Sequence, residues 1–524
     1  MSTTTRSKLS RTNRAIPLVL LACSSASLAQ FSVTTHHYDT SRTGWNSQES
    51  VLTPANVGSA AFGLLHTVTL DQKVNAQPLV VSNVKIGGRL HTVVYVATEG
   101  NTIYAIGANN GNVLLRRNFG TPVHEPFGCK NSVEVGIDST PVIDTTTGTM
   151  YAVIYKQTAS GPAYYIHALD LATLADKVHA RLITASHTLS DGSHTTFNAA
   201  VQRQRPGLLL ANGNVYAGFG SFCDHGVNES RGWLLGWQTG TLTPLPSNQI
   251  LDTQASSPNN YFLSAIWMSG SGLAADDAGN ILFVTGNSDP SGTTYDGITD
   301  IQESVVKISF DLTTVLDLFT PDNQPQLDKQ DKDFGAGGIM LLPDQPGSIP
   351  HLAVAAGKDG NMYFMNEDSL GGHSSTTNNV LGTYQIGNCW CGESYFNDGQ
   401  ARVVSSGGTQ VMVWTLSTSP NPSLTLAKSS AALAIRSGGF FTAVSSNGAS
   451  NPIIWVVALG SDLFTINLFA FDPETGNNSQ PMNQLFNGTA GTWNSTSRAF
   501  LVPVIANGKV FVATYAQLAI FGLN

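Results

Sequence analysis

Charged side chains are scarce in this chain: Asp, Glu, Lys and Arg make up only 12% of its 524 residues, and the formal net charge is −9. A nucleic-acid-binding protein needs a basic surface, so this acidic balance argues against a nucleic-acid partner. Long apolar runs are missing too, since the run at residues 15–22 is too short to cross a bilayer. We therefore expect neither a nucleic-acid partner nor a membrane-spanning segment.

Cysteine is also rare, with five residues, and no CxxCH motif is present, so no covalently attached haem is expected. Four cysteines remain if Cys23 is removed with the leader, and an even count in an exported protein favours disulfides. We prefer a bridge between Cys129 and Cys223, because both fall in loops just outside matching strands. Cys389 and Cys391 then form a tight bridge or stay reduced. Zinc is not expected, because this Cys-x-Cys lacks histidines at ligand spacing.

The first 29 residues have the pattern of a signal peptide, with small residues before a cleavage point at Gln30. Four basic residues precede the apolar run: Arg6, Lys8, Arg11 and Arg14. We expect residues 1–29 to be removed and residues 30–524 to form one exported domain, periplasmic or extracellular. A lipoprotein anchored through Cys23 is the weaker alternative.

What the chain does contain is a repeat: eight similar pairs of strands, spaced by about sixty residues, with Gly-containing turns. The first strand of each pair is marked by one of these residues: Tyr95, Tyr151, Tyr216, Phe283, Val354, Val404, Trp455 and Phe511. This period predicts an all-β fold, an eight-bladed β-propeller of four-stranded antiparallel blades. Residues 62–70 form a strand with no repeat of its own. We expect that strand to join the C-terminal blade and close the ring, which removes exposed sheet edges.

Polar residues follow equivalent strands, at what should be one end of the propeller. Taken singly they are ordinary: Asp224 and Asn287 suit turns, Trp267 suits a core, Asp333 suits a solvated loop and Lys358 suits a hairpin. Together they supply oxygen ligands, a carboxylate base, an aromatic face and a cation. That combination suits a hard cation and a flat anionic ligand.

The chain also resembles a known family, the pyrroloquinoline-quinone (PQQ) dehydrogenases, which are eight-bladed propellers. Residues 37–42 (HYDTSR) and 52–57 (LTPANV) are similar to the family's N-terminal segment. The chain looks closer still to exported bacterial PQQ-repeat-like proteins of unclear activity. Segments similar to theirs are residues 204–210 (QRPGLLL), 266–272 (IWMSGSG), 340–345 (MLLPDQ) and 502–514 (VPVIANGKVFVAT).

The resemblance implies a role for each of these polar residues. Asn287 and Asp224 match the positions of calcium ligands. Asp333, in an Asp-aromatic pair before the fifth blade, matches the catalytic aspartate. Lys358 matches the basic residue that contacts the quinone, and Trp267 lies close to the tryptophan that stacks beneath it.

Other positions depart from the family. The family has two adjacent cysteines where this chain has Cys129 followed by Lys130. Val135 stands where the family has an arginine. Asn75 stands where a carboxylate is expected before the first-blade proline. These departures predict a weaker clamp on the acidic groups of the quinone.

Three functions follow. The first is a PQQ- and Ca²⁺-dependent oxidoreductase acting on a small alcohol or sugar and passing electrons to a separate acceptor. The second is a non-catalytic propeller that binds a glycan, peptide or protein, since a fold alone does not imply catalysis. The third is a carbohydrate hydrolase or lyase that uses Asp224 with Asp331 and Asp333.

Overall fold

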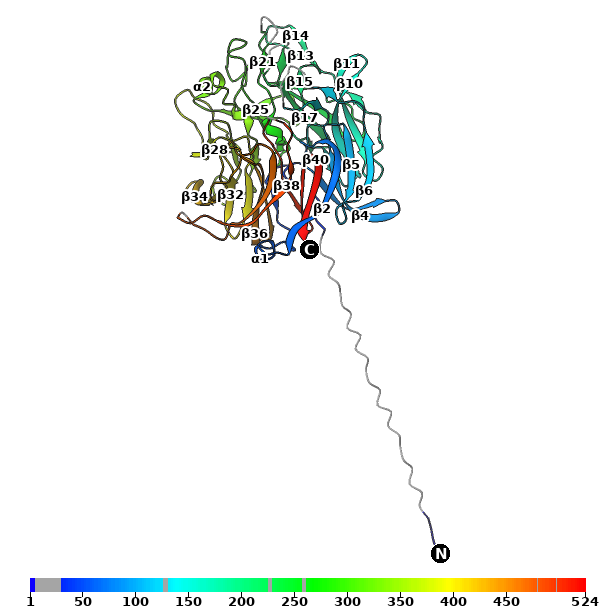
Figure 1. Cartoon of the computed structure of the whole chain (residues 1–524). Helices are drawn as coiled ribbons and strands as arrows, with labels where there is room; N and C mark the ends of the chain where they lie inside the picture. Colours follow the sequence, from blue (N-terminus) through cyan, green and yellow to red (C-terminus); the bar gives the residue numbers. More distant parts are fainter. Residues whose placement is uncertain (5–29, 126–130, 225–228, 257–260, 478, 496) are drawn as a thin grey trace.

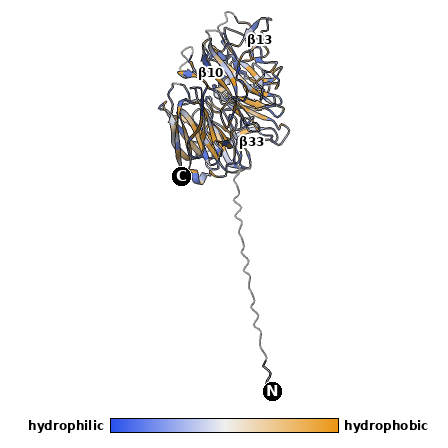
Figure 2. Cartoon of the chain, turned by 90° about the vertical axis from the view of Figure 1, so that its right-hand side faces the viewer, coloured by the Kyte–Doolittle hydropathy of each residue, from blue (hydrophilic) through white to orange (hydrophobic). Residues whose placement is uncertain are grey.

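Eight small β-sheets follow one another along the chain and form an eight-bladed propeller (Figure 1). The computed structural model describes residues 1–4, 30–125, 131–224, 229–256, 261–477, 479–495 and 497–524. The predicted signal peptide lies outside the described residues, except for residues 1–4. Strands carry the apolar residues and loops the polar ones (Figure 2), because each sheet packs both of its faces against neighbouring sheets.

The first four sheets come in chain order. The first consists of β3 (Leu79–Ile86), β4 (Arg89–Ala97), β5 (Thr102–Gly107) and β6 (Val113–Asn118). The second consists of β9 (Val142–Asp144), β10 (Thr149–Thr158), β11 (Gly161–Asp170) and β12 (Arg181–Leu182). The third consists of β15 (Gln202–Arg203), β16 (Leu209–Ala211), β17 (Asn214–Ser221), β19 (Trp233–Gln238) and β20 (Gln249–Ile250). The fourth consists of β22 (Ala274–Ala275), β23 (Ile281–Val284), β24 (Val305–Ile308), β25 (Val315–Thr320) and β29 (Gly372–His373).

The last four sheets complete the ring. The fifth consists of β26 (Ile339–Leu341), β27 (Leu352–Ala356), β28 (Asn361–Asn366) and β30 (Gly382–Gln385). The sixth consists of β31 (Ser394–Asn397), β32 (Ala401–Ser405), β33 (Met412–Ser417) and β34 (Ser423–Ser429). The seventh consists of β1 (Trp45–Asn46), β35 (Phe441–Asn447), β36 (Ser450–Leu459), β37 (Thr465–Asp472) and β38 (Asn483–Thr492). The eighth consists of β39 (Val504–Ala506), β40 (Lys509–Leu523) and β2 (Phe62–Lys73).

The eight repeat residues confirm the sequence-based register. Six lie in the second strand given for their sheet, while Tyr216 in β17 and Trp455 in β36 lie in the third because a short extra strand precedes them. All eight side chains are buried: Tyr95, Tyr151, Tyr216, Phe283, Val354, Val404, Trp455 and Phe511. Two of the Gly-containing turns of the repeats, Asn212–Gly213 and Asn507–Gly508, have positive φ at both residues. Such turns match the right-handed twist of the flanking strands, which is why Asn-Gly is a strong hairpin signal.

The number of strands varies from sheet to sheet. Four sheets have the expected four strands, and three gain a short fifth strand. In the eighth sheet β40 pairs with β39 through its first residues and with β2 through its last, from Phe62 opposite Leu523 to Lys73 opposite Tyr515. The N-terminal strand therefore lies in the C-terminal sheet.

Residues 33–46 cross the centre of the ring, a feature that the repeat alone does not predict. Their backbone or side chains hydrogen-bond the innermost strand of every sheet, or the residue next to it. The eight partners are Val80, Ile143, Leu208, Ala275, Leu341, Tyr395, Val444 and Ile505. A segment that contacts all eight inner edges must run along the axis, so it fills the central channel.

Arg42 holds this axial segment together. Its guanidinium is 1% exposed and donates to Thr35 Oγ1 at 2.7 Å, to His36 O at 2.8 Å and, through Nε, to Leu273 O at 2.8 Å. Burying a guanidinium is tolerated only where its donors find acceptors. Arg42 therefore links the axial segment to the third and fourth sheets.

Helices are few. The named α-helices in the described residues are α1 (Pro54–Val57) and α2 (Gln324–Lys329), with short 3-10 turns at Met268–Gly270 and Phe334–Ala336. Three two-stranded sheets of the described structure lie outside the eight blades. They pair β7 (Val123–His124) with β8 (Glu134–Val135), β13 (Ser186–Thr188) with β14 (His194–Thr196), and β18 (Ser230–Arg231) with β21 (Phe262–Leu263). None of the helices in the described part of the chain is long and apolar enough to span a membrane.

Candidate functional site

A cavity of about 280 Å³ opens at one end of the propeller. Its walls come from eight separate stretches of the chain, spread around the ring, so it lies close to the axis. The lining residues used below are Lys73, Arg203, Arg205, Asp224, Trp267, Asp331, Asp333, Lys358 and Arg498. Four of the five residues singled out in the sequence, Asp224, Trp267, Asp333 and Lys358, are among them.

Lys358 lies at the centre of the acidic side of this cavity. Its Nζ atom is 2.8 Å from Asp333 Oδ2 and 2.7 Å from Asp331 Oδ1, and 5.6 Å from the ring centre of Trp267. Lys358 lies two residues after the end of β27, and its backbone N–H donates to Asp333 O at 3.1 Å. The strand end and the preceding loop thus fix the lysine and the aspartate against each other.

Three carboxylates could hold a cation together. One oxygen from each of Asp224, Asp331 and Asp333 lies within 4.8 Å of the others. Asp224 is placed by the end of β17, where it accepts a hydrogen bond from Ser221 Oγ at 3.0 Å. Carboxylate oxygens at this spacing are the ligands that Ca²⁺ and similar hard cations prefer.

Three buried side-chain oxygens in this region lack partners in the described part of the chain. Asn287 Oδ1, Glu303 Oε1 and Asp333 Oδ1 are buried and find no hydrogen-bond donor among the described residues. Asn287 is not a lining residue of the cavity, but its backbone amide interacts with the Asp333 carboxylate. A buried polar atom without a partner is costly. Since all three atoms are oxygen acceptors, a bound cation would satisfy them.

The pKa values describe the same crowding of negative charge. Burial and the neighbouring Asp333 raise the pKa of Asp224 to about 7. Burial and Asp333 also raise the pKa of Glu303 well above its usual value. Burial alone would lower the pKa of Lys358, but Asp333 and Asp331 more than offset this and raise it. A multivalent cation between these carboxylates would offset their mutual repulsion and favour their ionised form.

Glu303 was missed in the sequence. Glu303 lies two residues before β24, has a positive φ of 51° and is fully buried. One of its carboxylate oxygens accepts from the backbone N–H of Phe334. The only signal for it is an acidic residue flanked by Gln302 and Ser304 before an apolar strand. Ordinary loops contain such a stretch equally often, so it does not single out a site residue.

The opposite side of the cavity is cationic. Arg203 Nε donates to Asp138 Oδ2 at 2.6 Å, and Arg205 Nη1 donates to Asp138 O at 2.9 Å. Burial opposes ionisation of Asp138, but Arg203 and Arg205 hold its pKa well below the usual range. Lys73 lies 3.5 Å from Glu99, both buried. Two arginines share one aspartate, so this wall keeps positive charge that an acidic ligand can use.

This arrangement changes the interpretation of the missing family residues. Asn75, which stands where the resemblance predicts a carboxylate, donates to Glu99 and to Asp138 and so supports the cationic wall. Val135 is buried apolar core. Arg203 and Arg205 supply positive charge from another sheet, and a pair of arginines alternating with glutamines before a strand was the available signal. Position-by-position matching with the family does not reveal these arginines, and the weaker clamp on the quinone stays a prediction.

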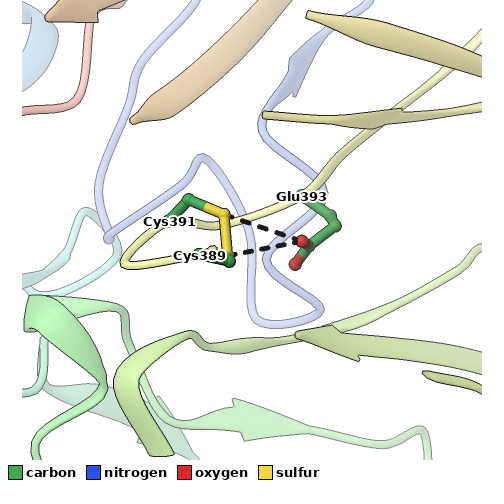
Figure 3. A group of neighbouring side chains, drawn as sticks. All are labelled: Cys389, Cys391 and Glu393. Carbon is green, nitrogen blue, oxygen red and sulfur yellow. Dashed lines mark hydrogen bonds between the residues drawn. A yellow bond between two sulfur atoms is a disulfide. The ribbon is translucent and has the colours of Figure 1, made fainter. Parts of the chain in front are cut away.

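A tight disulfide lies beside the site. Cys389 and Cys391 are bonded to each other, which settles the choice between a bridge and free thiols (Figure 3). The bridge encloses Trp390, whose ring centre lies 5.6 Å from Lys358 Nζ. Glu393 Oε1 lies 3.9 Å and 4.0 Å from the two sulfur atoms, and burial raises the pKa of Glu393 to about 7.

The other predicted disulfide joins Cys129 to Cys223. Cys129 lies outside the described residues, so this pairing remains a prediction. Cys223 is disulfide-bonded and lines the cavity. Asn131 Nδ2 lies 3.0 Å from Cys223 Sγ.

Comparison with known proteins rests on structure alone, because no family model and no curated protein matches the sequence. The fold is similar to that of a quinohemoprotein alcohol dehydrogenase, ADHIIG, from Pseudomonas putida HK5, with a TM-score of 0.64 and 12% identity, over 94% of this chain and 80% of the other. The quinohemoprotein alcohol dehydrogenase of Comamonas testosteroni gives a TM-score of 0.60 and 13% identity, over 95% and 81%. A europium-containing methanol dehydrogenase has a TM-score of 0.61 and a sequence identity of 10%, over 94% of this chain and 98% of the other.

These likenesses confirm the predicted fold, the eight-bladed propeller found in quinoprotein dehydrogenases. Identities of 10–13% show shared architecture and no more. The roles of the site residues therefore depend on the geometry of this chain.

Proposed function

We propose that the protein is a quinoprotein oxidoreductase that oxidises the hydroxyl group of a small alcohol or sugar with bound PQQ and a hard cation. The convergence of Asp224, Asp331, Asp333 and Lys358 in one axial cavity carries this proposal. The cavity combines what such a reaction needs: a cation site, a base, a flat aromatic floor and positive charge for an acidic cofactor.

The residues present fit a cation. Asp224, Asp331 and Asp333 would hold it, with Asn287 Oδ1 and Glu303 Oε1 as nearby oxygens that lack donors in the described structure. The calcium expected from the sequence suits this set, and so does a trivalent cation, because three carboxylates lie within reach of one another and Glu303 interacts electrostatically with Asp333. A bound cation would lower the pKa values that burial and mutual repulsion now raise.

The residues also fit a flat acidic ligand. Trp267 offers an aromatic face next to Lys358, and Arg203 and Arg205 would hold carboxylates at the other side. A bound PQQ would supply the acceptor for two electrons and the hydrogen of the substrate carbon. The electrons would then leave for a separate acceptor.

Asp333 is the group placed to take the proton of the substrate hydroxyl. It is 1% exposed, and its Oδ1 is free of hydrogen-bond donors among the described residues while Oδ2 is held by Lys358. Burial raises the pKa of Asp333, which makes the carboxylate a better base than an exposed aspartate. Lys358 orients that base and keeps it ionised.

The test is reconstitution of the full chain with PQQ and either Ca²⁺ or Eu³⁺, followed by dye-coupled oxidation of a panel of alcohols and sugars. The proposal predicts a bound-cofactor spectrum and turnover, and a loss of turnover of at least about 100-fold in Asp333→Asn. Asp398→Asn, far along the chain in the sixth sheet and paired with Arg402, is the matched control. No bound cofactor and no turnover with either ion would rule the proposal out.

One observation favours the second candidate, a propeller that binds a ligand without catalysis. Lys358 already occupies Oδ2 of Asp333 and one oxygen of Asp331, so the base is partly neutralised. If the reconstituted protein binds PQQ tightly but oxidises none of the substrates, the protein is a ligand-binding propeller and not an oxidoreductase.

A further inference from the structure

Arg498 lines the cavity without a carboxylate beside it. Its guanidinium carbon lies 3.9 Å from the ring centre of Trp390, and Nη1 donates to Ser437 O. No Asp or Glu of the described residues comes within ion-pair distance of Arg498, whereas Arg203 and Arg205 share Asp138. Arg498 is therefore a cation of the cavity whose charge the described residues leave uncompensated.

The position of Arg498 is built into the fold. Gly438 has a φ of +122°, and a Cβ atom there would collide with the Arg498 guanidinium. The backbone N–H of Trp390 donates to Gly438 O at 2.8 Å, and the Cys389–Cys391 bridge encloses Trp390. Glycine makes room for the guanidinium on one side while the tryptophan supports it on the other.

An anion would stabilise this arginine. Burial, together with the neighbouring Arg436, lowers the pKa of Arg498 to about 10. Two positive groups close together in a partly buried place repel each other. The planar guanidinium with its forked donors matches a carboxylate best.

Arg498 also lies near the proposed reaction centre. Its guanidinium carbon is 3.9 Å and Lys358 Nζ is 5.6 Å from the same Trp390 ring centre. Lys358 in turn holds Asp333. Arg498, Lys358 and Asp333 all line the same cavity, so a small molecule held in that cavity has both Arg498 and Asp333 as neighbours.

We infer that Arg498 and Trp390 form a carboxylate-binding subsite and that the substrate is a hydroxy carboxylate, such as a sugar acid. The carboxylate pairs with Arg498, whose guanidinium the Trp390 ring supports, and a hydroxyl group of the same molecule points toward Asp333. Oxidation of this substrate depends on the proposed function, but binding of the anion does not. Binding and turnover can therefore be tested separately.

The experiment is calorimetric titration of the full chain, without added cofactor, with D-gluconate and with D-glucose. We expect gluconate to bind at least about tenfold more tightly, because a charged hydrogen-bonded pair is gained. Arg498→Gln should remove this preference, and Arg498→Lys should keep part of it. Arg116→Gln is the control, since Arg116 is an exposed arginine on β6 paired with Asp71.

Equal affinity for the two sugars would overturn the inference. So would a gluconate preference that survives in Arg498→Gln and disappears in Arg203→Gln, because the anion would then bind the opposite wall. Preferential binding through Arg498 with no oxidation by the reconstituted protein would support the subsite and reject only the proposed enzymatic function.

Discussion

Lys358 Nζ lies 2.8 Å from Asp333 Oδ2 in the wall of the axial cavity. The ammonium group compensates part of a negative charge that no other cation of the described residues approaches as closely. It also leaves Asp333 Oδ1 without a donor. The pair therefore holds a base in place with one oxygen available, and this relationship is the basis of the first prediction.

Replacing Lys358 by Met should have opposite effects on cation binding and on turnover. Removing a positive charge beside the carboxylates should tighten Ca²⁺ binding by about tenfold. The same change should lower turnover of the reconstituted protein by about 100-fold or more, since Asp333 loses the group that orients it. Calorimetry and a dye-coupled assay measure the two quantities. Unchanged or weaker Ca²⁺ binding would show that the cation does not share the site with Lys358.

The pH dependence of stability should change sign when a cation is added. The folded pKa of Asp224, about 7, lies above its ordinary value of 3.8. Its contribution to stability is therefore complete below about pH 4 and is lost as pH rises toward 7. With Ca²⁺, which binds the ionised carboxylates, added stability should instead grow over this range. Thermal melts with and without Ca²⁺ measure this, and Asp224→Asn should reduce both effects. Identical melting curves at all pH values would contradict the prediction.

Arg42→Met should destabilise the fold because three or more backbone and side-chain acceptors would lose a buried donor. We expect a loss of about 3 kcal/mol or more in the free energy of unfolding. Denaturant unfolding measures this loss. Arg116→Met, at an exposed position, should change the same quantity by about 0.5 kcal/mol or less. A similar small effect at Arg42 would mean that the axial segment does not tie the sheets together.

Glu393→Gln should increase stability at alkaline pH relative to the natural chain. Burial raises the pKa of Glu393 to about 7 from 4.5, so the contribution of its protonated form is lost as pH rises through 7. The amide cannot ionise. Between pH 4.5 and about 7, the difference in unfolding free energy between the variant and the natural chain should therefore rise by about 1 kcal/mol per pH unit. Glu474→Gln, at an exposed turn, should give a flat difference, and a flat difference at Glu393 would refute the effect.

The repeat was enough to predict the fold. Residues such as Tyr95 and Trp455 lie in equivalent strands because alternation and turn chemistry are local properties that sequence displays directly. The same register placed Asp224, Trp267, Asp333 and Lys358 at one end of the ring, and all four line one cavity. Loops that follow equivalent strands of a propeller must meet near the axis, so this part of the site was predictable.

The cationic wall and the axial segment were not predictable in this way. Arg203 and Arg205 line the cavity and share Asp138, which lies about 65 residues earlier in the chain, and no local pattern shows this contact. Arg42 gains its partners from segments more than 150 residues away, including Leu208 and Leu273. Long-range pairings of this kind depend on the closed ring and become visible only with it.

The most direct test of the site is a calorimetric titration of PQQ into the full chain in the presence and absence of Ca²⁺. We predict one PQQ bound per chain, with an affinity that rises at least tenfold when Ca²⁺ is present and that falls in Asp224→Asn and Arg205→Gln. Binding that is absent, or that is equal with and without Ca²⁺ and in both variants, would contradict the assignment of this cavity to a quinone and its cation.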